Sequence, residues 1–95
     1  MDVQHDSAGQ RFTTEVAGGT AELGYRRIDP TTVDLVHTKV PDAAAGQGIG
    51  GKLAQAVFTW ARQSGTKLVI TCPFVKKWLE RHPDQADLVS PRPGG

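Results

Sequence analysis

The sequence predicts a single α/β domain (α+β in the order of its elements) with a mixed sheet. Three observations lead to this fold class. Residues 11–40 contain three runs with β-like composition or alternating polarity, separated by turn residues. Apolar residues between 49 and 61 recur at spacings of three and four, as on one face of a helix. A short apolar run, 67–71, and a second helical pattern from Pro73 complete the series. We expect an antiparallel meander, then a βαβ crossover and a C-terminal helix.

The meander is expected from strands at 11–16, 20–28 and 32–40. Gly18 and Gly19 separate the first two strands, and a glycine pair can supply the positive φ angles of a tight hairpin turn. Short connections of this kind favour antiparallel neighbours. The first three long strands should therefore pair in the order of the sequence.

The third strand should carry Val33, Leu35 and His37 on one face, because side chains alternate along a strand. Pro41 ends this strand, since proline lacks the N–H that a sheet ladder needs. His37 is thus predicted to share a face with apolar residues.

The crossover helix should end at Gly65, because glycine commonly adopts the left-handed conformation after a helix. A strand, a helix and a second strand form a right-handed crossover, so 32–40 and 67–71 should be parallel. Pro73 suits the first turn of the next helix, and Pro83 ends that helix. The apolar stripes predict a core made of Ile49, Leu53, Ala56, Val57, Trp60, Ala61, Phe74 and Trp78. For the three large aromatic residues among these, a platform on which a flat ring such as adenine stacks is the weaker alternative.

The ends of the chain have weaker patterns. Residues 1–9 are expected to be loose or to form an edge strand at 3–5, and residues 10–88 to form the domain. Residues 89–95 are rich in proline and glycine and are expected to be a disordered tail.

Composition limits the class of partner. The net charge is +1 and the basic residues are scattered, which argues against a nucleic-acid or membrane-surface protein. The polar N-terminus lacks the pattern of a signal peptide, and no apolar run approaches the ~18–20 residues of a membrane span. A single cysteine, Cys72, cannot form an intrachain disulfide and fits a reducing compartment. We expect a cytoplasmic monomer or weak homodimer.

The glycine-rich run 46–51 lies between a predicted strand and a predicted helix. Amides at such a junction can approach a phosphate closely, and the helix start adds unpaired N–H donors, although a plain structural turn has the same composition. A dinucleotide fingerprint does not fit, because the strand 67–71 lacks the acidic residue for a ribose. A nucleotide triphosphatase loop does not fit either, because Leu53 stands where a hydroxyl is needed. The sequence predicts an anion site here.

At this point the motifs match a known family. His37–Pro41, Gly46–Leu53, Cys72–Val75 and Trp78–Pro83 together resemble the short GCN5-related N-acetyltransferase-like (GNAT-like) proteins. The resemblance covers roughly residues 10–88. It implies a sheet whose parallel strands splay apart, with acetyl-CoA as the cofactor bound in the opening. Ala45 stands where the family commonly has arginine, so Lys52 or another cation would have to replace that charge.

The resemblance also implies a set of cofactor-binding residues. The glycine run would hold the pyrophosphate through its amides, and the strand ending at Val40 would hold the pantetheine arm and the acetyl carbonyl. The cofactor-binding residues so implied are Thr38, Lys39, Val40, Gly46, Gln47, Gly48, Ile49, Gly50, Gly51 and Lys52. Apart from what the resemblance implies, the charged residues of the second helix, Lys76, Lys77, Glu80 and Arg81, are expected to form a solvated face, with contact of one basic side chain to the 3′-phosphate of CoA as the alternative.

Two side chains are candidates for catalysis. Cys72 falls at the end of a parallel strand and before a helix, a position that favours a reactive thiolate, although free cysteine is also a common buried apolar residue. It would accept the acetyl group or touch the acetyl end of the cofactor. His37 would deprotonate an amine, or serve only as a hydrogen-bonded core residue. His82 ends a helix, where it favours the helix dipole, with catalysis as the weaker alternative. No histidine or cysteine spacing is typical of metal ligands, so no metal is expected.

The function that the resemblance implies is transfer of an acetyl group from acetyl-CoA, a small-molecule thioester, to an amine. The sequence leaves the acceptor open: a small amine, a protein lysine and an N-terminus all fit. A non-catalytic CoA-binding or CoA-sensing module and a plain interaction domain are the alternatives.

Overall fold

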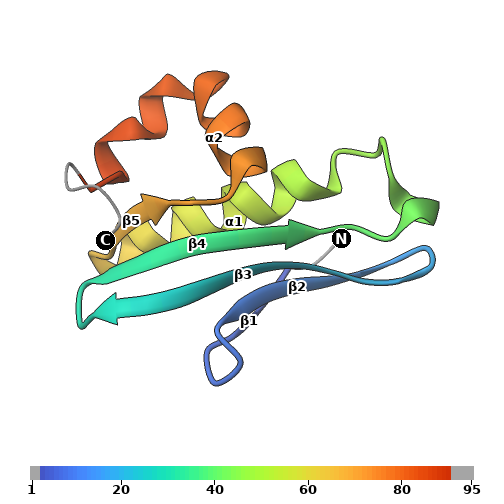
Figure 1. Ribbon diagram of the computed structural model, residues 1–95, viewed down its shortest axis with the longest axis horizontal. Helices are drawn as coiled ribbons and strands as arrows, with labels where there is room; N and C mark the ends of the chain where they lie inside the picture. The colour runs from blue at the N-terminus through green and yellow to red at the C-terminus, as the bar shows by residue number, and fades with distance from the viewer. Residues whose placement is uncertain (1–2, 91–95) are drawn as a thin grey trace.

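A computed structural model describes residues 3–90, and within that range five strands form one sheet in the order β1-β2-β3-β4-β5 (Figure 1). Two α-helices and two short 3-10 helices complete the fold. In chain order the elements are β1 (Gln4–Asp6), β2 (Arg11–Val16), β3 (Gly19–Asp29), β4 (Thr32–Lys39), η1 (Asp42–Ala44), α1 (Ile49–Ser64), β5 (Lys67–Ile70), α2 (Pro73–Glu80) and η2 (Pro83–Leu88).

The sheet is mixed, as the sequence predicts. β1, β2, β3 and β4 pair antiparallel with their neighbours, and β4 pairs parallel with β5. At the hairpin between β2 and β3, Gly18 has φ 86° and Gly19 has φ 140°, conformations that favour glycine. The predicted meander and βαβ crossover are therefore confirmed, and the fold class is α+β with a mixed sheet.

A β-bulge in β4 changes the face on which His37 lies. Gly24 pairs with His37, but the next pair joins Tyr25 to Leu35, so Val36 is an extra residue on β4. The bulge reverses the alternation, and side chains after it point to the opposite faces. The prediction that His37 shares a face with Leu35 is wrong: Leu35 is in the core and His37 is exposed.

α1 begins after Gly48 and ends at Gly65, and both glycines adopt the left-handed conformation. Its buried side is wider than the predicted stripe. Phe58 is fully buried, with its ring 5.0 Å from that of Trp78 on α2, whereas Trp60 is only partly buried. The buried side of α1 is wide because the helix contacts β2 and β3 on one side and α2 and η2 on another. A helix covered on two sides buries more than one stripe.

Trp60 belongs instead to an aromatic cluster that attaches β1 to the fold. The ring of His5 stacks on Phe12 with 4.1 Å between ring centroids and meets Trp60 edge-on at 4.8 Å. The His5 Nε2 and Tyr25 Oη atoms are 2.7 Å apart and share a hydrogen bond. These contacts remove water from the imidazole and lower the pKa of His5 below its ordinary value of 6.5, an effect to which the charge of Arg27 adds and which that of Asp6 opposes.

We expect the protein to lose stability as the pH falls below about 6.5. Because the pKa of His5 is lower in the folded state, the unfolded chain takes up the proton first, and the contribution of His5 is complete only above the unfolded pKa. Urea unfolding at about pH 7.5 and pH 5.5 measures the loss, and this window lies above the titration of the carboxylates. His5→Gln should reduce the slope of unfolding free energy against pH. An unchanged slope in that variant would show that His5 does not cause the loss of stability at low pH.

The C-terminal part of the described chain returns to the sheet. Val89 forms a parallel bridge with Leu68, and the Ser90 amide donates a 2.7 Å hydrogen bond to the Leu68 carbonyl. Residues 89 and 90, which the sequence assigns to the tail, therefore lie along the outer side of β5. Residues 1–2 and 91–95 lie outside the described residues. None of the helices between residues 3 and 90 has the length and apolar character of a membrane span.

Candidate functional site

β4 and β5 separate part of the way along their length. Their pairing runs from Thr32–Lys67 to Leu35–Ile70. The Leu35 carbonyl then accepts the amides of both Thr71 (3.0 Å) and Cys72 (2.9 Å). Beyond this point β4 continues to Lys39, and no strand of the described part of the chain pairs with it on the β5 side. The open edge of β4 keeps main-chain groups available to a ligand.

Side chains connect the two strands on both faces at this point. On one face the Thr71 hydroxyl donates a 2.6 Å hydrogen bond to Asp34, whose side chain is nearly buried and lies 3.8 Å from the exposed Arg26 guanidinium. On the other face Thr38 Oγ1 and Cys72 Sγ lie 3.4 Å apart. These two contacts fix the place where the strands begin to diverge.

A cleft of about 390 Å³ opens from the end of β4 to the start of α1. Its walls come from three parts of the chain: the second half of β4, the segment that leads into α1, and the first turn of α2. The lining residues are Thr38, Val40, Ala44, Ala45, Gly46, Gly48, Ile49, Gly50, Gly51 and Phe74.

The glycine-rich loop presents free main-chain donors to this cleft. Gly46 (φ 81°) and Gly48 (φ 73°) adopt conformations that favour glycine, and an added Cβ at either would meet open space. The Lys52 amide bonds to the Gly48 carbonyl, which starts the helix. No acceptor within the described residues bonds to the amides of 46–51. These unpaired donors at the positive end of a helix form an arrangement suited to phosphate.

Seven of the ten cofactor-binding residues implied by the resemblance line the cleft, and three do not. Lys39 points to the other face of β4, Gln47 is exposed on the loop, and Lys52 lies on the outer surface of α1. Lys52 is therefore not in the wall of the cleft beside Ala45, where the missing arginine would be replaced. Sequence reasoning did not include Ala44 or Ala45 in the site, and it considered Phe74 there only as the weaker alternative, a stacking platform for adenine. Ala45 was noted only as a departure, although its small side chain contributes to the opening.

Phe74 was predicted to be part of the core, and this is wrong. Its side chain is 44% exposed and covers the first turn of α1. An added Cβ at Gly50 would lie 2.6 Å from Phe74 Cζ, so the missing side chain there allows the ring to approach the helix. Phe74 follows the helical spacing of Trp78, but at the first turn of α2 that face looks onto the cleft rather than onto the core.

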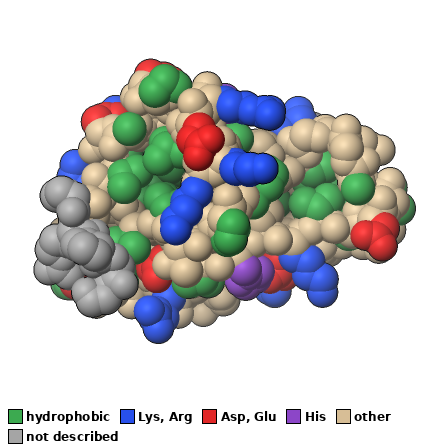
Figure 2. All heavy atoms as spheres, turned by 45° about the horizontal axis from the view of Figure 1, so that its top comes forward, with side chains coloured by type: hydrophobic (Ala, Val, Ile, Leu, Met, Phe, Trp, Pro, Cys, Tyr) green, Lys and Arg blue, Asp and Glu red, His purple; other side chains and the backbone are tan. Residues whose placement is uncertain are grey.

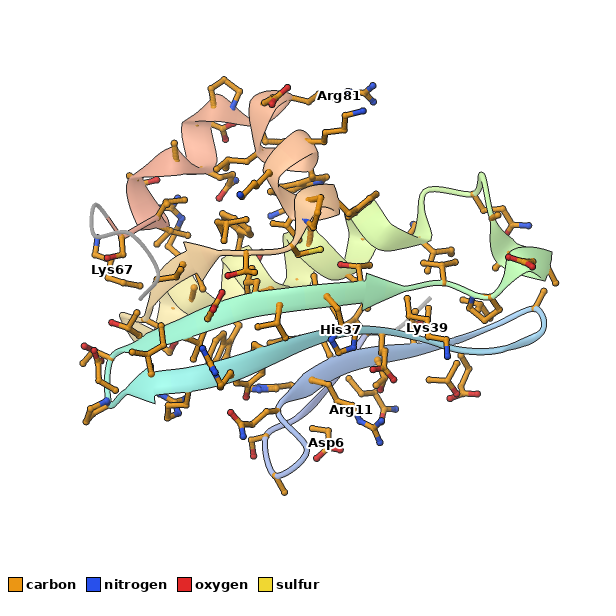
Figure 3. The ribbon with its side chains drawn as sticks, in the orientation of Figure 1. Asp6, Arg11, His37, Lys39, Lys67 and Arg81 are labelled. Atoms are coloured by element: carbon orange, nitrogen blue, oxygen red, sulfur yellow. The ribbon has the colours of Figure 1, made fainter. Side chains whose placement is uncertain are left out.

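Cys72 and His37 lie on opposite faces of the sheet. Cys72 is 3% exposed, next to Thr38, and does not itself line the cleft. His37 is exposed on the face without helices, where Figure 3 shows it beside Lys39 on β4. The structure therefore does not bring the two proposed catalytic side chains together.

His37 has a partner that the sequence did not identify. Its Nε2 atom lies 2.8 Å from a carboxylate oxygen of Glu22 on β3, and its ring packs over Gly24, where an added Cβ would collide with it. Arg11 lies 3.4 Å from the same carboxylate group. The hydrogen bond from His37 lowers the pKa of Glu22, with smaller contributions from the charges of His37 and Arg11. Glu22 thus stays ionised and orients the imidazole.

His82 has a structural role at the end of α2. Its ring stacks on Trp78 with centroids 4.1 Å apart, and its Nδ1–H donates a 2.8 Å hydrogen bond to the Trp78 carbonyl. That bond satisfies a carbonyl near the end of the helix, as expected for a histidine at this position. Across residues 3–90 no group of three or more His, Cys, Asp or Glu residues could hold a metal ion.

The mixed sheet that splays beside a glycine-rich helix start is the arrangement that the resemblance to acetyltransferase-like proteins implies. The chain belongs to the GCN5-related N-acetyltransferase family, because residues 11–88 match the model of that family. The family resemblance of its motifs is therefore confirmed.

Individual relatives agree with this assignment. Protein NATD1 of Xenopus tropicalis is 35% identical over 83 residues, which cover 85% of this chain and 76% of that protein. Protein NATD1 of Homo sapiens is also 35% identical over 83 residues, covering 85% and 74% respectively. The NMR solution structure of a GCN5-like protein from Staphylococcus aureus superposes with a TM-score of 0.73 at 30% identity, covering 94% of this chain and 87% of that one.

Proposed function

We propose that this protein binds acetyl-CoA in the cleft and transfers its acetyl group to an amine. One observation carries the proposal: the unpaired amides of the loop 46–51 and the unpaired edge of β4 border the same cleft. CoA thioesters combine a diphosphate with an amide-containing arm, so they need both kinds of partner. The fit does not depend on any charged side chain in the wall of the cleft.

Different residues of the cleft would bind different parts of acetyl-CoA. The amides of Gly46–Gly51 would hold the diphosphate, and the free main-chain groups near Val40 would hold the pantetheine arm. Thr38, which lines the cleft and contacts Cys72, would lie at the acetyl end. In this proposal Cys72 acts through its contact with Thr38 and does not itself touch the ligand. Its low exposure disfavours the alternative in which its sulfur accepts the acetyl group.

The amine would approach from the face of the sheet that no helix covers, where His37 and Glu22 lie. The amine nitrogen forms the new bond to the acetyl carbon as the carbon–sulfur bond of the thioester breaks. His37 would take the proton that the amine loses, and the CoA sulfur leaves as the thiolate and is protonated to the thiol. Holding both reactants in place supplies much of the rate in such a transfer.

Calorimetric titration with acetyl-CoA tests binding, and release of free CoA thiol with a panel of amines tests transfer. We expect His37→Gln to lower kcat at least tenfold and leave the Kd for acetyl-CoA unchanged, since a general base contributes about 10²–10⁴-fold. Glu22→Gln should also lower kcat and leave the Kd for acetyl-CoA unchanged, because it removes the carboxylate that orients the imidazole.

His5→Gln is the matched control, because His5 packs against Phe12 and Trp60 outside the cleft and should leave kcat unchanged. Binding without transfer to any amine would favour the CoA-binding or CoA-sensing module. If acetyl-CoA did not bind, the plain interaction domain would be the one alternative left. The lone reduced cysteine fits the cytosol, and a cytoplasmic location is part of the proposal.

A further inference from the structure

A second cavity of about 220 Å³ lies along α2, next to the cleft. It is lined by Phe74, Lys77, Trp78, Arg81 and His82. Phe74 lines both cavities, so the two hollows adjoin across this one ring. A ligand that leaves the loop 46–51 on this side would pass directly into the second cavity.

The two cations of this cavity have no acidic partner. Among residues 3–90 no carboxylate lies within 4.0 Å of the Lys77 amine or the Arg81 guanidinium. Arg62, by contrast, is paired with Asp87 at 2.9 Å. Figure 2 shows Lys and Arg side chains beside apolar surface where this part of the molecule comes forward, and Figure 3 shows Arg81 extending from the end of α2. Their charges are available to an anion.

The floor of the cavity is aromatic. Trp78 is nearly buried and is covered on one side by the ring of His82. Phe74, with 44% of its surface exposed, offers a free ring. A flat aromatic group can stack on such a ring irrespective of its hydrogen-bonding pattern.

We propose that Lys77 and Arg81 bind the 3′-phosphate of CoA while its adenine packs against Phe74. This inference rests on the proposed function, which places the diphosphate at the loop. Beyond the diphosphate, CoA carries a purine and a phosphate dianion, and the adjoining cavity offers an aromatic ring and two unpaired cations. Lys76 is excluded, because it lies on the same helix but outside both cavities.

The test compares CoA with dephospho-CoA, which lacks only the 3′-phosphate, by calorimetric titration of the whole chain at one fixed, low salt concentration, because salt screens exposed charges. For the unmodified protein we expect CoA to bind about tenfold more tightly, which is near the lower limit for hydrogen bonds to a charged group. In the double variant Lys77→Ala/Arg81→Ala the ratio should fall to within about twofold of one, with the affinity for dephospho-CoA unchanged. Lys76→Ala is the matched control and should keep the ratio.

The outcomes separate the two proposals. If the protein binds CoA and dephospho-CoA equally, or if the double variant keeps the preference, this inference is wrong and the proposed function stands. An equal loss in Lys76→Ala would indicate a general electrostatic attraction and also overturn the assignment. If neither ligand binds the unmodified protein, the proposed function fails and this inference fails with it.

The role of Phe74 has its own comparison, because 4′-phosphopantetheine lacks the whole nucleotide end. Dephospho-CoA should bind more tightly than 4′-phosphopantetheine, and Phe74→Ala should reduce that ratio at least threefold. Because Phe74 also lines the cleft, the ratio rather than either affinity is the measurement. An unchanged ratio would overturn the placement of the adenine.

Discussion

Gly48→Glu is expected to weaken acetyl-CoA binding at least a hundredfold. The substitution places a carboxylate at the residue before α1, beside the free amides proposed to hold the diphosphate. A hundredfold loss corresponds to about 2.7 kcal/mol, which lies within the ~1–4 kcal/mol of repulsion between two unit charges about 4 Å apart near a protein surface. Calorimetric titration measures the change in Kd.

Two further variants isolate the charge from other effects of the substitution. Gly48→Gln has nearly the same shape and the same strain at φ 73°, without the charge, and should weaken binding much less. Gly65→Glu places the same side chain at φ 70°, in open space at the far end of α1, and should leave binding unchanged. If Gly48→Glu bound acetyl-CoA as tightly as Gly48→Gln, the loop would not be the diphosphate site.

Phe58→Ala is expected to lower the free energy of unfolding by about 3–5 kcal/mol, the range for large aromatic residues removed from a core. The side chain is fully buried between the sheet and α2, where it meets Trp78. Because small domains have about 5–15 kcal/mol of stability in total, the variant should be close to unfolding at physiological temperature. Urea denaturation followed by circular dichroism measures the change.

Gln63→Ala is the control for this prediction. Gln63 is exposed on the same helix, so the substitution should change the unfolding free energy by no more than about 0.5 kcal/mol. A loss below about 1 kcal/mol in Phe58→Ala would contradict the view that α1 is buried on two sides. Such a result would mean that only the predicted stripe of α1 is buried and that Phe58 lies outside it.

The elements and their order were predictable because each depends on local chemistry. Gly65 ends a helix and Pro73 begins one for reasons that involve only their own backbone angles. The parallel pairing of β4 and β5 follows from the handedness of the crossover. The glycine loop could likewise be located from composition alone.

The parts that were missed depend on which strand residues face each other. The extra residue Val36 becomes visible only when β3 and β4 are paired, and it alone decides the face of His37. Glu22 could be recognised as the partner of His37 only after that pairing is known. The contact between Asp34 and Thr71 joins residues far apart in the sequence and leaves no local pattern.

The return of Val89 and Ser90 to Leu68 bears on how copies of this protein behave toward one another. An edge strand with free amides and carbonyls can pair with a strand of another molecule, and repeated pairing of this kind leads to aggregation. Here β5 has its outer side occupied by its own chain, and at the opposite border β1 offers only three residues for pairing. Within residues 3–90 the sheet therefore has little free strand edge at its two sides on which a second copy could pair, and its longer unpaired edge lies inside the fold at β4.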